Sequence, residues 1–238
     1  ARRASAQRVT AVLPFYGYAR QDRKDQPRVP ITAKLAANLL VTAGADRILT
    51  VDLHSQQVQG FFDIPVDHLY AAPVLMQYLN GVLDDESVVV APDSGGVKMA
   101  HSYSTAMETG LAIVAKRRVS AEEVNTMHLV GDVEGRDCVL VDDVVTTAGT
   151  LCGAAEKLRA AGAERIFAAV SHCNITEKGS KRLQESAITQ LVTSDSIPCK
   201  HAAENGKIKV LSVAGLLGEA IRRIHDNQSV SSLFRVST

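Results

Sequence analysis

Cys138-Val-Leu-Val-Asp142-Asp143-Val-Val-Thr146-Thr147-Ala148-Gly149-Thr150 carries the strongest local structural signal in the sequence. A short apolar run ends in two acidic residues and leads into a turn of small and hydroxyl side chains, which predicts a buried strand followed by a loop. Thr150 is expected to cap a helix whose apolar side runs from Leu151 to Leu158 and which ends at Gly162. Strand, turn and helix in this order form the repeating unit of an α/β protein.

Other short apolar runs rich in β-branched residues predict further strands that are buried on both faces. They are Val9 to Leu13, Ile48 to Val51, Val88 to Ala91, Ala112 to Ala115, Val139 to Val141 and Ile166 to Val170. Helical patterns lie between several of them, as in the segment that Thr32 is expected to cap and that ends near Gly44. Because strands and helices alternate, we expect an α/β fold with largely parallel sheets.

A repeated segment indicates duplicated domains. The run Ala43-Gly-Ala-Asp-Arg-Ile48 is followed six residues later by His54, and Ala161-Gly-Ala-Glu-Arg-Ile166 is followed at the same spacing by His172. Chance is the alternative, because glycine ends many helices, but the shared residues favour two similar α/β domains.

The boundary between the two domains is expected near residue 71, after the turn-prone segment Asp63 to Asp67. About 70 residues precede this boundary, fewer than the roughly 100 to 150 of a usual doubly wound domain. The first domain is therefore expected to be incomplete at its N-terminus.

Composition and charge exclude several classes of protein. Lys plus Arg equals Asp plus Glu at 26 each, so the overall charge favours neither nucleic acid nor a membrane surface as a partner. The apolar runs are too short to span a bilayer and Ala1 to Arg8 is too polar for a signal peptide, which makes the cytoplasm the expected compartment. The four cysteines lie far apart without a CxxC pair, which argues against a disulfide framework and against structural zinc.

The turn after Asp143 is suited to a phosphate group. Small side chains let backbone N–H groups approach an anion, and the start of a helix adds partial positive charge. Asp142 and Asp143 could accept hydrogen bonds from the vicinal hydroxyls of a ribose. The alternative is a capped turn between strand and helix with no ligand.

The paired acids and the Thr-Ala-Gly-Thr turn resemble the phosphoribosyl-binding loop of type I phosphoribosyltransferases and of the pyrophosphokinases related to them. Further segments resemble class I ribose-phosphate pyrophosphokinases in that family's order, across nearly the whole chain. They are Gly17 to Lys24, Thr50 to His54, Gln59 to Asp63, Ala91 to Gly96 and Lys116 to Arg118. A phosphoribosyltransferase is the alternative, but it would explain only Asp142 to Thr150.

The resemblance implies an activity and its cofactor. The family transfers the pyrophosphoryl group of ATP to the anomeric hydroxyl of ribose 5-phosphate and uses Mg²⁺. By this resemblance Arg20 and Gln21 would contact ATP, His54 would bind both ATP and the metal, and Asp93 would be the second metal ligand.

The resemblance also implies where ribose 5-phosphate binds. Asp142 and Asp143 would face the ribose. The 5-phosphate would be held by Thr146, Thr147, Ala148, Gly149 and Thr150. Lys116 and Arg118 would be the catalytic cations, at the base of a loop that closes over the triphosphate.

Some positions depart from the family pattern. Thr146 stands where the family usually has Asp, Met99 replaces a usual Arg, and Ser171 to Lys181 differs from the family's loop. Because the family includes non-catalytic associated proteins, a regulatory homologue is the alternative to an enzyme. Retention of Lys116, Arg118, His54 and Asp93 favours the enzyme. Thr146 and the incomplete first domain favour the regulatory homologue.

The resemblance also implies the domain organisation and the assembly. Residues 1–70 would form a partial phosphoribosyltransferase-like domain, completed by residues 218–238, and residues 71–217 would form the second domain, with the ribose-phosphate loop. Val213 to Ile224 has the apolar spacing of a helix. The tail Ser229 to Phe234 resembles a segment at subunit interfaces, so we expect a homo-oligomer built of dimers, as a hexamer.

Overall fold

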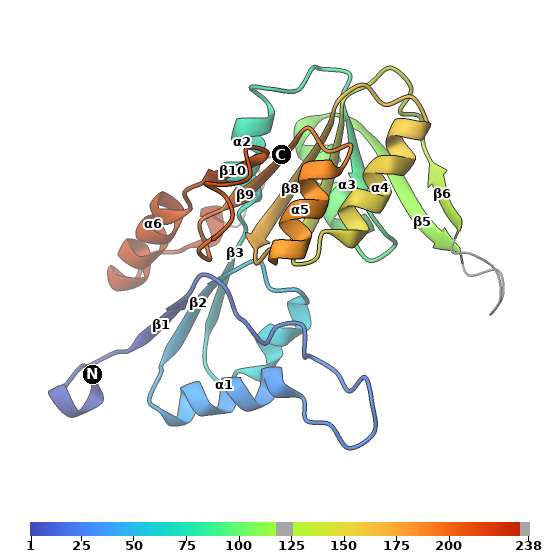
Figure 1. Ribbon diagram of the computed structural model, residues 1–238. Helices are drawn as coiled ribbons and strands as arrows, with labels where there is room; N and C mark the ends of the chain where they lie inside the picture. The colour runs from blue at the N-terminus through green and yellow to red at the C-terminus, as the bar shows by residue number, and fades with distance from the viewer. Residues whose placement is uncertain (118–125, 234–238) are drawn as a thin grey trace. The chain divides into compact units, whose positions relative to one another are not determined.

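The computed structural model describes residues 1–117 and 126–233, and the chain forms two compact units (Figure 1). Unit 1 contains Ala1–Ala71 and the C-terminal segment from Ala214, and unit 2 contains Ala72–Val213. Among the described residues, every helix is too short or too polar to cross a bilayer.

Unit 1 is built on a three-stranded parallel sheet in the order β1-β2-β3. Its strands are β1 (Thr10–Leu13), β2 (Arg47–Val51) and β3 (Val66–Leu69), with helix α1 (Thr32–Thr42) between β1 and β2 and the 3-10 helix η2 (Gln56–Phe61) after β2. Ala33 and Ala37 of α1 are fully buried in an apolar cluster with Ile48 of β2. Small side chains on the helix thus allow close packing against the sheet.

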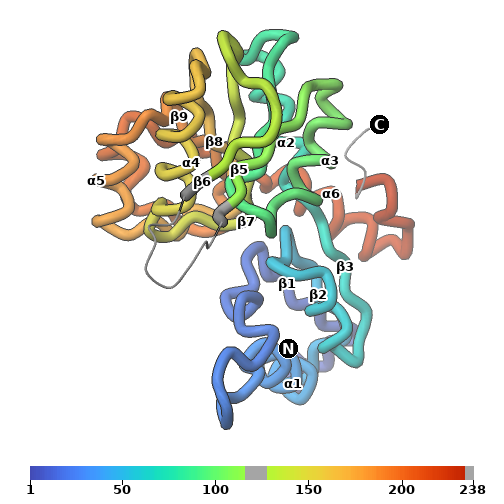
Figure 2. The backbone as a smooth tube through the Cα atoms, turned by 90° about the vertical axis from the view of Figure 1, so that its right-hand side faces the viewer, coloured from blue at the N-terminus to red at the C-terminus, as the bar shows by residue number. Residues whose placement is uncertain are grey.

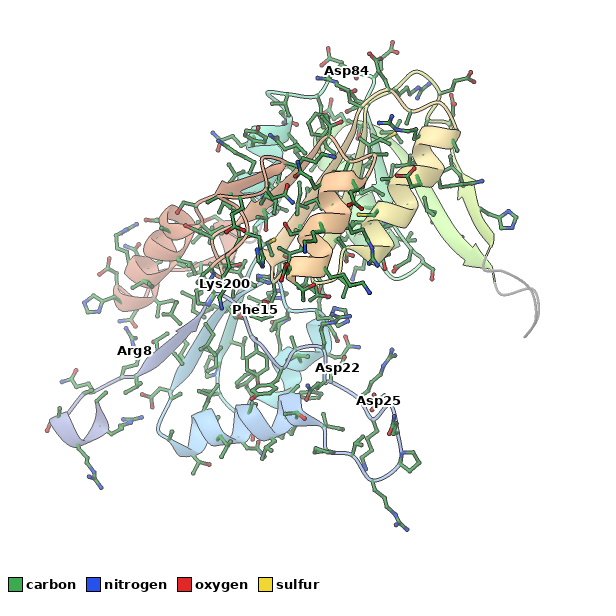
Figure 3. All side chains as sticks on the ribbon, in the orientation of Figure 1. Arg8, Phe15, Asp22, Asp25, Asp84 and Lys200 are labelled. Carbon is green, nitrogen blue, oxygen red and sulfur yellow. The ribbon has the colours of Figure 1, made fainter. Side chains whose placement is uncertain are left out.

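The C-terminal helix α6 (Ala214–His225) belongs to unit 1, together with the 3-10 helices η1 (Arg2–Ala4) and η3 (Ser231–Leu233). Arg8, labelled in Figure 3, connects the residues before β1 to the end of this helix. Its Nη2 donates to the Ile224 carbonyl at 2.9 Å and its Nη1 donates to Asn227 Oδ1 at 3.1 Å. A cation thus satisfies the carbonyl at the C-terminus of α6.

Unit 2 is built on a seven-stranded sheet in the order β10-β9-β8-β7-β4-β5-β6, in which only β6 is antiparallel to its neighbour. Its strands are β4 (Val88–Ala91), β5 (Gly110–Arg117), β6 (Thr126–Val130), β7 (Cys138–Val145), β8 (Ile166–Cys173), β9 (Gln190–Ser194) and β10 (Ile208–Leu211). Its helices are α2 (Ala72–Leu79), α3 (Val97–Met107), α4 (Gly149–Ala160) and α5 (Glu177–Glu185). Figure 2 shows α2 and α3 on one side of this sheet and α4 and α5 on the other.

The predicted α/β fold with largely parallel sheets is confirmed, and each predicted strand lies in or overlaps an observed one. The prediction of a turn over Asp63 to Asp67 is wrong at its end, because β3 begins at Val66 and pairs with β2. An acidic residue is tolerated on this strand because Arg47 Nη1 lies 2.7 Å from Asp67 Oδ2. No strand was predicted for β3, β6, β9 or β10.

The repeated segment has the same local structure in both units. Gly44 after α1 and Gly162 after α4 adopt left-handed backbone angles, with φ of 104° and 87°. In each case the next amide closes the helix end, from Ala45 N to Leu40 O and from Ala163 N to Leu158 O, both at 3.1 Å. Glycine is required at this position because a side chain there would be strained.

Both predicted helix caps are wrong. Helix α1 begins at Thr32 itself, so that Ile31 holds the cap position and no side chain caps the helix. Helix α4 begins at Gly149, and the residue before it, Ala148, has a φ of 55°. A residue with left-handed backbone turns the chain into the helix, and this leaves Thr150 inside the first turn.

Candidate functional site

The carboxyl ends of β4 and β7 form a topological switch point in unit 2. The two strands are adjacent and parallel, yet the chain leaves β4 through α3 toward β5 and leaves β7 through α4 toward β8, on the opposite side. In open α/β sheets, ligands bind in the crevice at such a point. Asp93 follows β4, and Asp142 and Asp143 lie in the last half of β7.

The loop between β4 and α3 is organised by Asp93. Its Oδ1 accepts hydrogen bonds from the amides of Gly95 at 2.9 Å and Gly96 at 3.2 Å. A Cβ at Gly96 would lie 3.7 Å from the Val141 carbonyl oxygen, so this loop passes close to β7. Asp93 Oδ2 accepts no hydrogen bond from the residues that the structure describes, and it is the oxygen available to a ligand.

The acidic pair on β7 includes a carboxyl with a strongly raised pKa. Burial raises the pKa of Asp142 to about 7, and the neighbouring charges of Asp143 and Asp93 add to the effect. The Asp143 amide donates to Asp142 Oδ1 at 2.9 Å, which opposes the shift but does not cancel it. A group whose pKa is raised by burial and like charge at a switch point is a candidate for ligand binding, because a cation or a hydroxyl donor would relieve the repulsion.

The segment after β7 presents both hydroxyl side chains and backbone to solvent. Thr147 is exposed and Thr146, Gly149 and Thr150 are partly exposed, whereas Ala148 is buried. The N-terminus of α4 begins directly behind this segment. Small side chains, three hydroxyls and a helix start therefore lie together, as a phosphate requires.

The residues predicted to bind ATP lie in unit 1. Arg20 and Gln21 are exposed in the loop between β1 and α1, where Figure 3 also labels Asp22 and Asp25. The loop is fixed to the first turn of α1, because the Ala33 amide donates to the Gln21 carbonyl at 3.2 Å and Tyr16 Oη donates to the Ala33 carbonyl at 2.7 Å. Burial raises the pKa of Tyr16 to about 12, so this hydroxyl remains a donor at neutral pH.

His54 is exposed just beyond the carboxyl end of β2. The turn before it is held by two hydrogen bonds. Asp52 Oδ2 accepts from the Ala71 amide at 2.8 Å, and the Leu53 amide donates to His68 Nε2 at 2.9 Å. His54 thus belongs to unit 1 and Asp93 to unit 2.

Lys116 is the residue before the end of β5, in register with Met127 of β6. Arg118 lies outside the described residues, so the structure says nothing of its position. Of the two residues predicted to be catalytic cations, only Lys116 can therefore be located, near the end of β5.

Two family models match the chain. The N-terminal domain of ribose phosphate pyrophosphokinase matches residues 1–44, and the phosphoribosyl synthetase-associated domain matches residues 118–235. Ribose-phosphate pyrophosphokinase A from Dictyostelium discoideum is 50% identical over 98% of this chain and 74% of its own length. The ribose-phosphate pyrophosphokinase of Chlorobaculum tepidum is 49% identical over 98% of this chain and 72% of its own length.

The chain belongs to the ribose-phosphate pyrophosphokinase family.

The structure of this pyrophosphokinase-family chain agrees with the sequence comparisons. It is similar to the crystal structure of phosphoribosylpyrophosphate synthetase from Mycobacterium smegmatis, with a TM-score of 0.88 and 42% identity over 95% of this chain and 74% of that one. The predicted family resemblance is confirmed.

The pyrophosphokinase-family chain also has contacts near the site that sequence reasoning missed. Helix α5 packs against the segment after β7 through Gly179 and Arg182, neither of which was predicted to matter. The family resemblance did not indicate these residues, because they lie in or beside Ser171 to Lys181, where the sequence departs from the family pattern. Both residues contact backbone atoms of the loop, so no complementary side chain in the sequence indicates the contact.

Proposed function

We propose that this chain catalyses the transfer of the pyrophosphoryl group of ATP to ribose 5-phosphate. The anomeric hydroxyl attacks the β-phosphorus of ATP and loses its proton, the bond from that phosphorus to the α–β bridging oxygen breaks, and AMP leaves. The products are 5-phosphoribosyl 1-diphosphate and AMP. The observation that carries this proposal is membership of the ribose-phosphate pyrophosphokinase family at about half identity over nearly the whole chain.

We assign ribose 5-phosphate to unit 2. Asp142 and Asp143 would accept hydrogen bonds from the ribose hydroxyls, and the 5-phosphate would receive hydrogen bonds from the backbone and hydroxyls of Thr146 to Thr150. The assignment is supported by the position of both groups at the carboxyl end of β7, the strand at the switch point. A sugar phosphate held at two ends is oriented as well as bound, which lowers the entropic part of the barrier.

We assign ATP to Arg20, Gln21 and His54 of unit 1, and we assign the stabilisation of transition-state charge to Lys116 and Arg118. Phosphoryl transfer needs aligned atoms and neutralised charge more than covalent help from the protein. Exposed polar side chains on a loop fixed to the start of α1 are suited to aligning ATP, and strong cations are suited to neutralising charge.

We propose Mg²⁺ as the cofactor, with His54 and Asp93 as its protein ligands. The donor chemistry of unit 2 fits, because Asp93 keeps one carboxylate oxygen available and Asp142 is destabilised by neighbouring negative charge. In residues 1–117 and 126–233, His, Cys, Asp and Glu do not gather in threes to hold an ion. This also fits Mg²⁺, which usually takes one or two carboxylates and completes its shell with water and substrate phosphates. When bound, the ion would neutralise charge on the triphosphate.

We further propose that the chain acts in the cytoplasm as a homo-oligomer built of dimers, as a hexamer. The family resemblance supports this, and light scattering of the purified chain tests it, because a monomer at micromolar concentration would contradict it.

The test of the activity is a magnesium-dependent assay for AMP and 5-phosphoribosyl 1-diphosphate from ATP and ribose 5-phosphate. Lys116→Ala should lower turnover by roughly a hundredfold, and Arg159→Ala, at an exposed residue in the last turn of α4 and so at the end of that helix away from the loop, should not. If the folded wild-type chain binds ribose 5-phosphate but makes no product, a regulatory homologue replaces the enzyme.

A further inference from the structure

The loop that follows β7 is held from behind by the segment that follows β8. Three successive carbonyls, from the last residue of β7 and the first two residues of the loop, accept hydrogen bonds from that segment. The Asn174 amide donates to the Val145 carbonyl at 3.0 Å and the Thr176 amide donates to the Thr146 carbonyl at 3.0 Å. Arg182 Nη1 donates to the Thr147 carbonyl at 2.8 Å.

These bonds set the direction of the amides that a phosphate would use. A trans peptide unit is planar, and its C=O and N–H point in opposite directions. None of the described peptide bonds is cis. Because the three carbonyls point toward residues 174–182, the amides of Thr146, Thr147 and Ala148 point away from that segment. Successive amides aimed the same way form an anion-binding concavity.

Helix α5 lies in direct contact with the loop backbone. A Cβ at Gly179 would lie 2.5 Å from the Thr146 carbonyl oxygen and 3.1 Å from the Thr147 carbonyl carbon, so no other residue fits there without a shift. Thr176 caps the helix by accepting from the Gly179 amide at 3.1 Å. The first turn of α5 is thus capped and tightly packed under the loop.

Arg182 completes this support from the second turn of α5. It is half-buried, and a Cβ at Gly149 would lie 3.0 Å from its Nη1, so the guanidinium covers the first residue of α4 as well as the Thr147 carbonyl. A hydrogen bond from a charged donor to a backbone carbonyl is stronger than one between neutral groups. The neighbouring Lys181 is exposed and pairs with Glu177 at 2.8 Å instead.

We propose that Arg182 is a positioning residue that fixes the 5-phosphate-binding conformation of residues Thr146 to Thr150 through the Thr147 carbonyl. This rests on the proposed function, in which that loop binds the 5-phosphate of ribose 5-phosphate. Arg182 acts on the Thr147 peptide unit and so on the Ala148 amide, and Asn174, Thr176 and Gly179 hold the two peptide units before it.

The kinetic test compares Arg182→Gln with Lys181→Gln, which removes the same charge from the adjacent position but touches no part of the loop. Arg182→Gln should raise KM for ribose 5-phosphate by about tenfold, as expected for a lost charged hydrogen bond, and should leave kcat and KM for ATP within about twofold. Lys181→Gln should behave as wild type. Arg182→Lys should recover part of the loss, because an ammonium keeps the charge but not the planar donor geometry.

A second readout separates this proposal from the proposed function. In the ligand-free protein, hydrogen exchange at the Asn174 and Thr176 amides should be faster in Arg182→Gln than in Lys181→Gln, because the loop carbonyls that accept from them are held less firmly. Absence of any ribose 5-phosphate binding by the wild type would refute the proposed function, and the exchange rates would still test the role of Arg182. Unchanged exchange together with an unchanged KM for ribose 5-phosphate would overturn that role, as would an equal rise in KM for both substrates.

Discussion

His54 in unit 1 and His172 in unit 2 occupy the same place in the repeated segment, and their surroundings differ completely. His54 is exposed, whereas His172 is 1% exposed and its Nδ1 lies 2.7 Å from Ser196 Oγ. Each comes after a helix closed by a left-handed glycine, but His54 lies beyond the end of β2, whereas His172 is the second-last residue of β8. The repeat therefore conserves the scaffold but not the environment of its last residue.

The backbone two residues before each histidine explains the difference. Asp52 has a φ of 39°, and its carboxylate accepts from the Ala71 amide, so the chain turns out of the sheet at the end of β2. Val170 stands at the same offset before His172, and there β8 continues to Cys173 with every residue buried. Asp adopts left-handed backbone angles far more readily than a β-branched residue does.

The offset of a histidine from a repeat thus does not fix its role. A change of one backbone conformation decides whether the side chain is available to a ligand or part of the core.

Removal of each histidine should give opposite results. His54→Ala should lower kcat/KM by about tenfold to a hundredfold, as loss of a metal-site group does, with an unchanged melting temperature because the side chain is exposed. His172→Ala should lower the melting temperature by about 2 to 8 °C, through a lost buried hydrogen bond. Activity assays and thermal unfolding check both, and a fully active His54→Ala would remove His54 from the site.

Substitutions in the two units should affect different substrates. Asp142→Ala should raise KM for ribose 5-phosphate by about tenfold and KM for ATP much less, because it removes an acceptor for the ribose hydroxyls. Arg20→Ala should show the reverse. Initial rates measured with each substrate varied in turn would reveal the pattern, and equal changes in both KM values would indicate a structural role for the residue.

The closing glycines of the repeat should be equivalent, unlike the histidines. Gly44→Ala and Gly162→Ala each place a Cβ on a left-handed backbone, which costs at least about 1 kcal/mol of unfolding free energy. The melting temperature should fall by about 2 to 4 °C in each case. Thermal unfolding would contradict the equivalence if only one variant were destabilised.

The raised pKa of Asp142 predicts a pH-dependent stability for unit 2. The folded-state pKa of about 7 exceeds the unfolded value, so the folded chain binds more protons between about pH 4 and 7. Ionisation of this carboxyl therefore lowers the free energy of unfolding more and more as pH rises through this window. The full decrease is reached above about pH 7.

Asp142→Asn should remove that cost. Without metal and substrates, its melting temperature should exceed that of wild type by several degrees at pH 8 and match it at pH 4. Thermal unfolding in EDTA at both pH values measures this, and an equal difference at the two values would exclude titration of Asp142 as the cause.

Much of the fold could be predicted from the sequence, because buried parallel strands appear as short apolar runs and helices end at glycines. The end of the turn predicted over Asp63 to Asp67 was wrong because the charge of Asp67 on β3 is neutralised by Arg47, a partner from another strand. The helix cap predicted at Thr150 was wrong because Ala148 takes a backbone conformation that its side chain does not signal.

Less of the candidate site could be predicted. The loop after β7 could be identified from the sequence because its small and hydroxyl residues are contiguous. The contribution of α5 could not be predicted, because Arg182 and Gly179 contact carbonyl groups more than thirty positions earlier in the chain. The exposure of His54 and the burial of His172 likewise depend on local backbone geometry.

The close fit of α5 under the loop has a consequence for protein engineering. Transfer of Thr146 to Thr150 alone into another α/β protein would carry the residues that face a phosphate but leave behind the donors that orient their peptide groups. A working graft would need the whole interval from β7 through the second turn of α5, with Gly179 kept as glycine. The smallest portable module is thus a strand–helix–strand–helix block and not a five-residue motif.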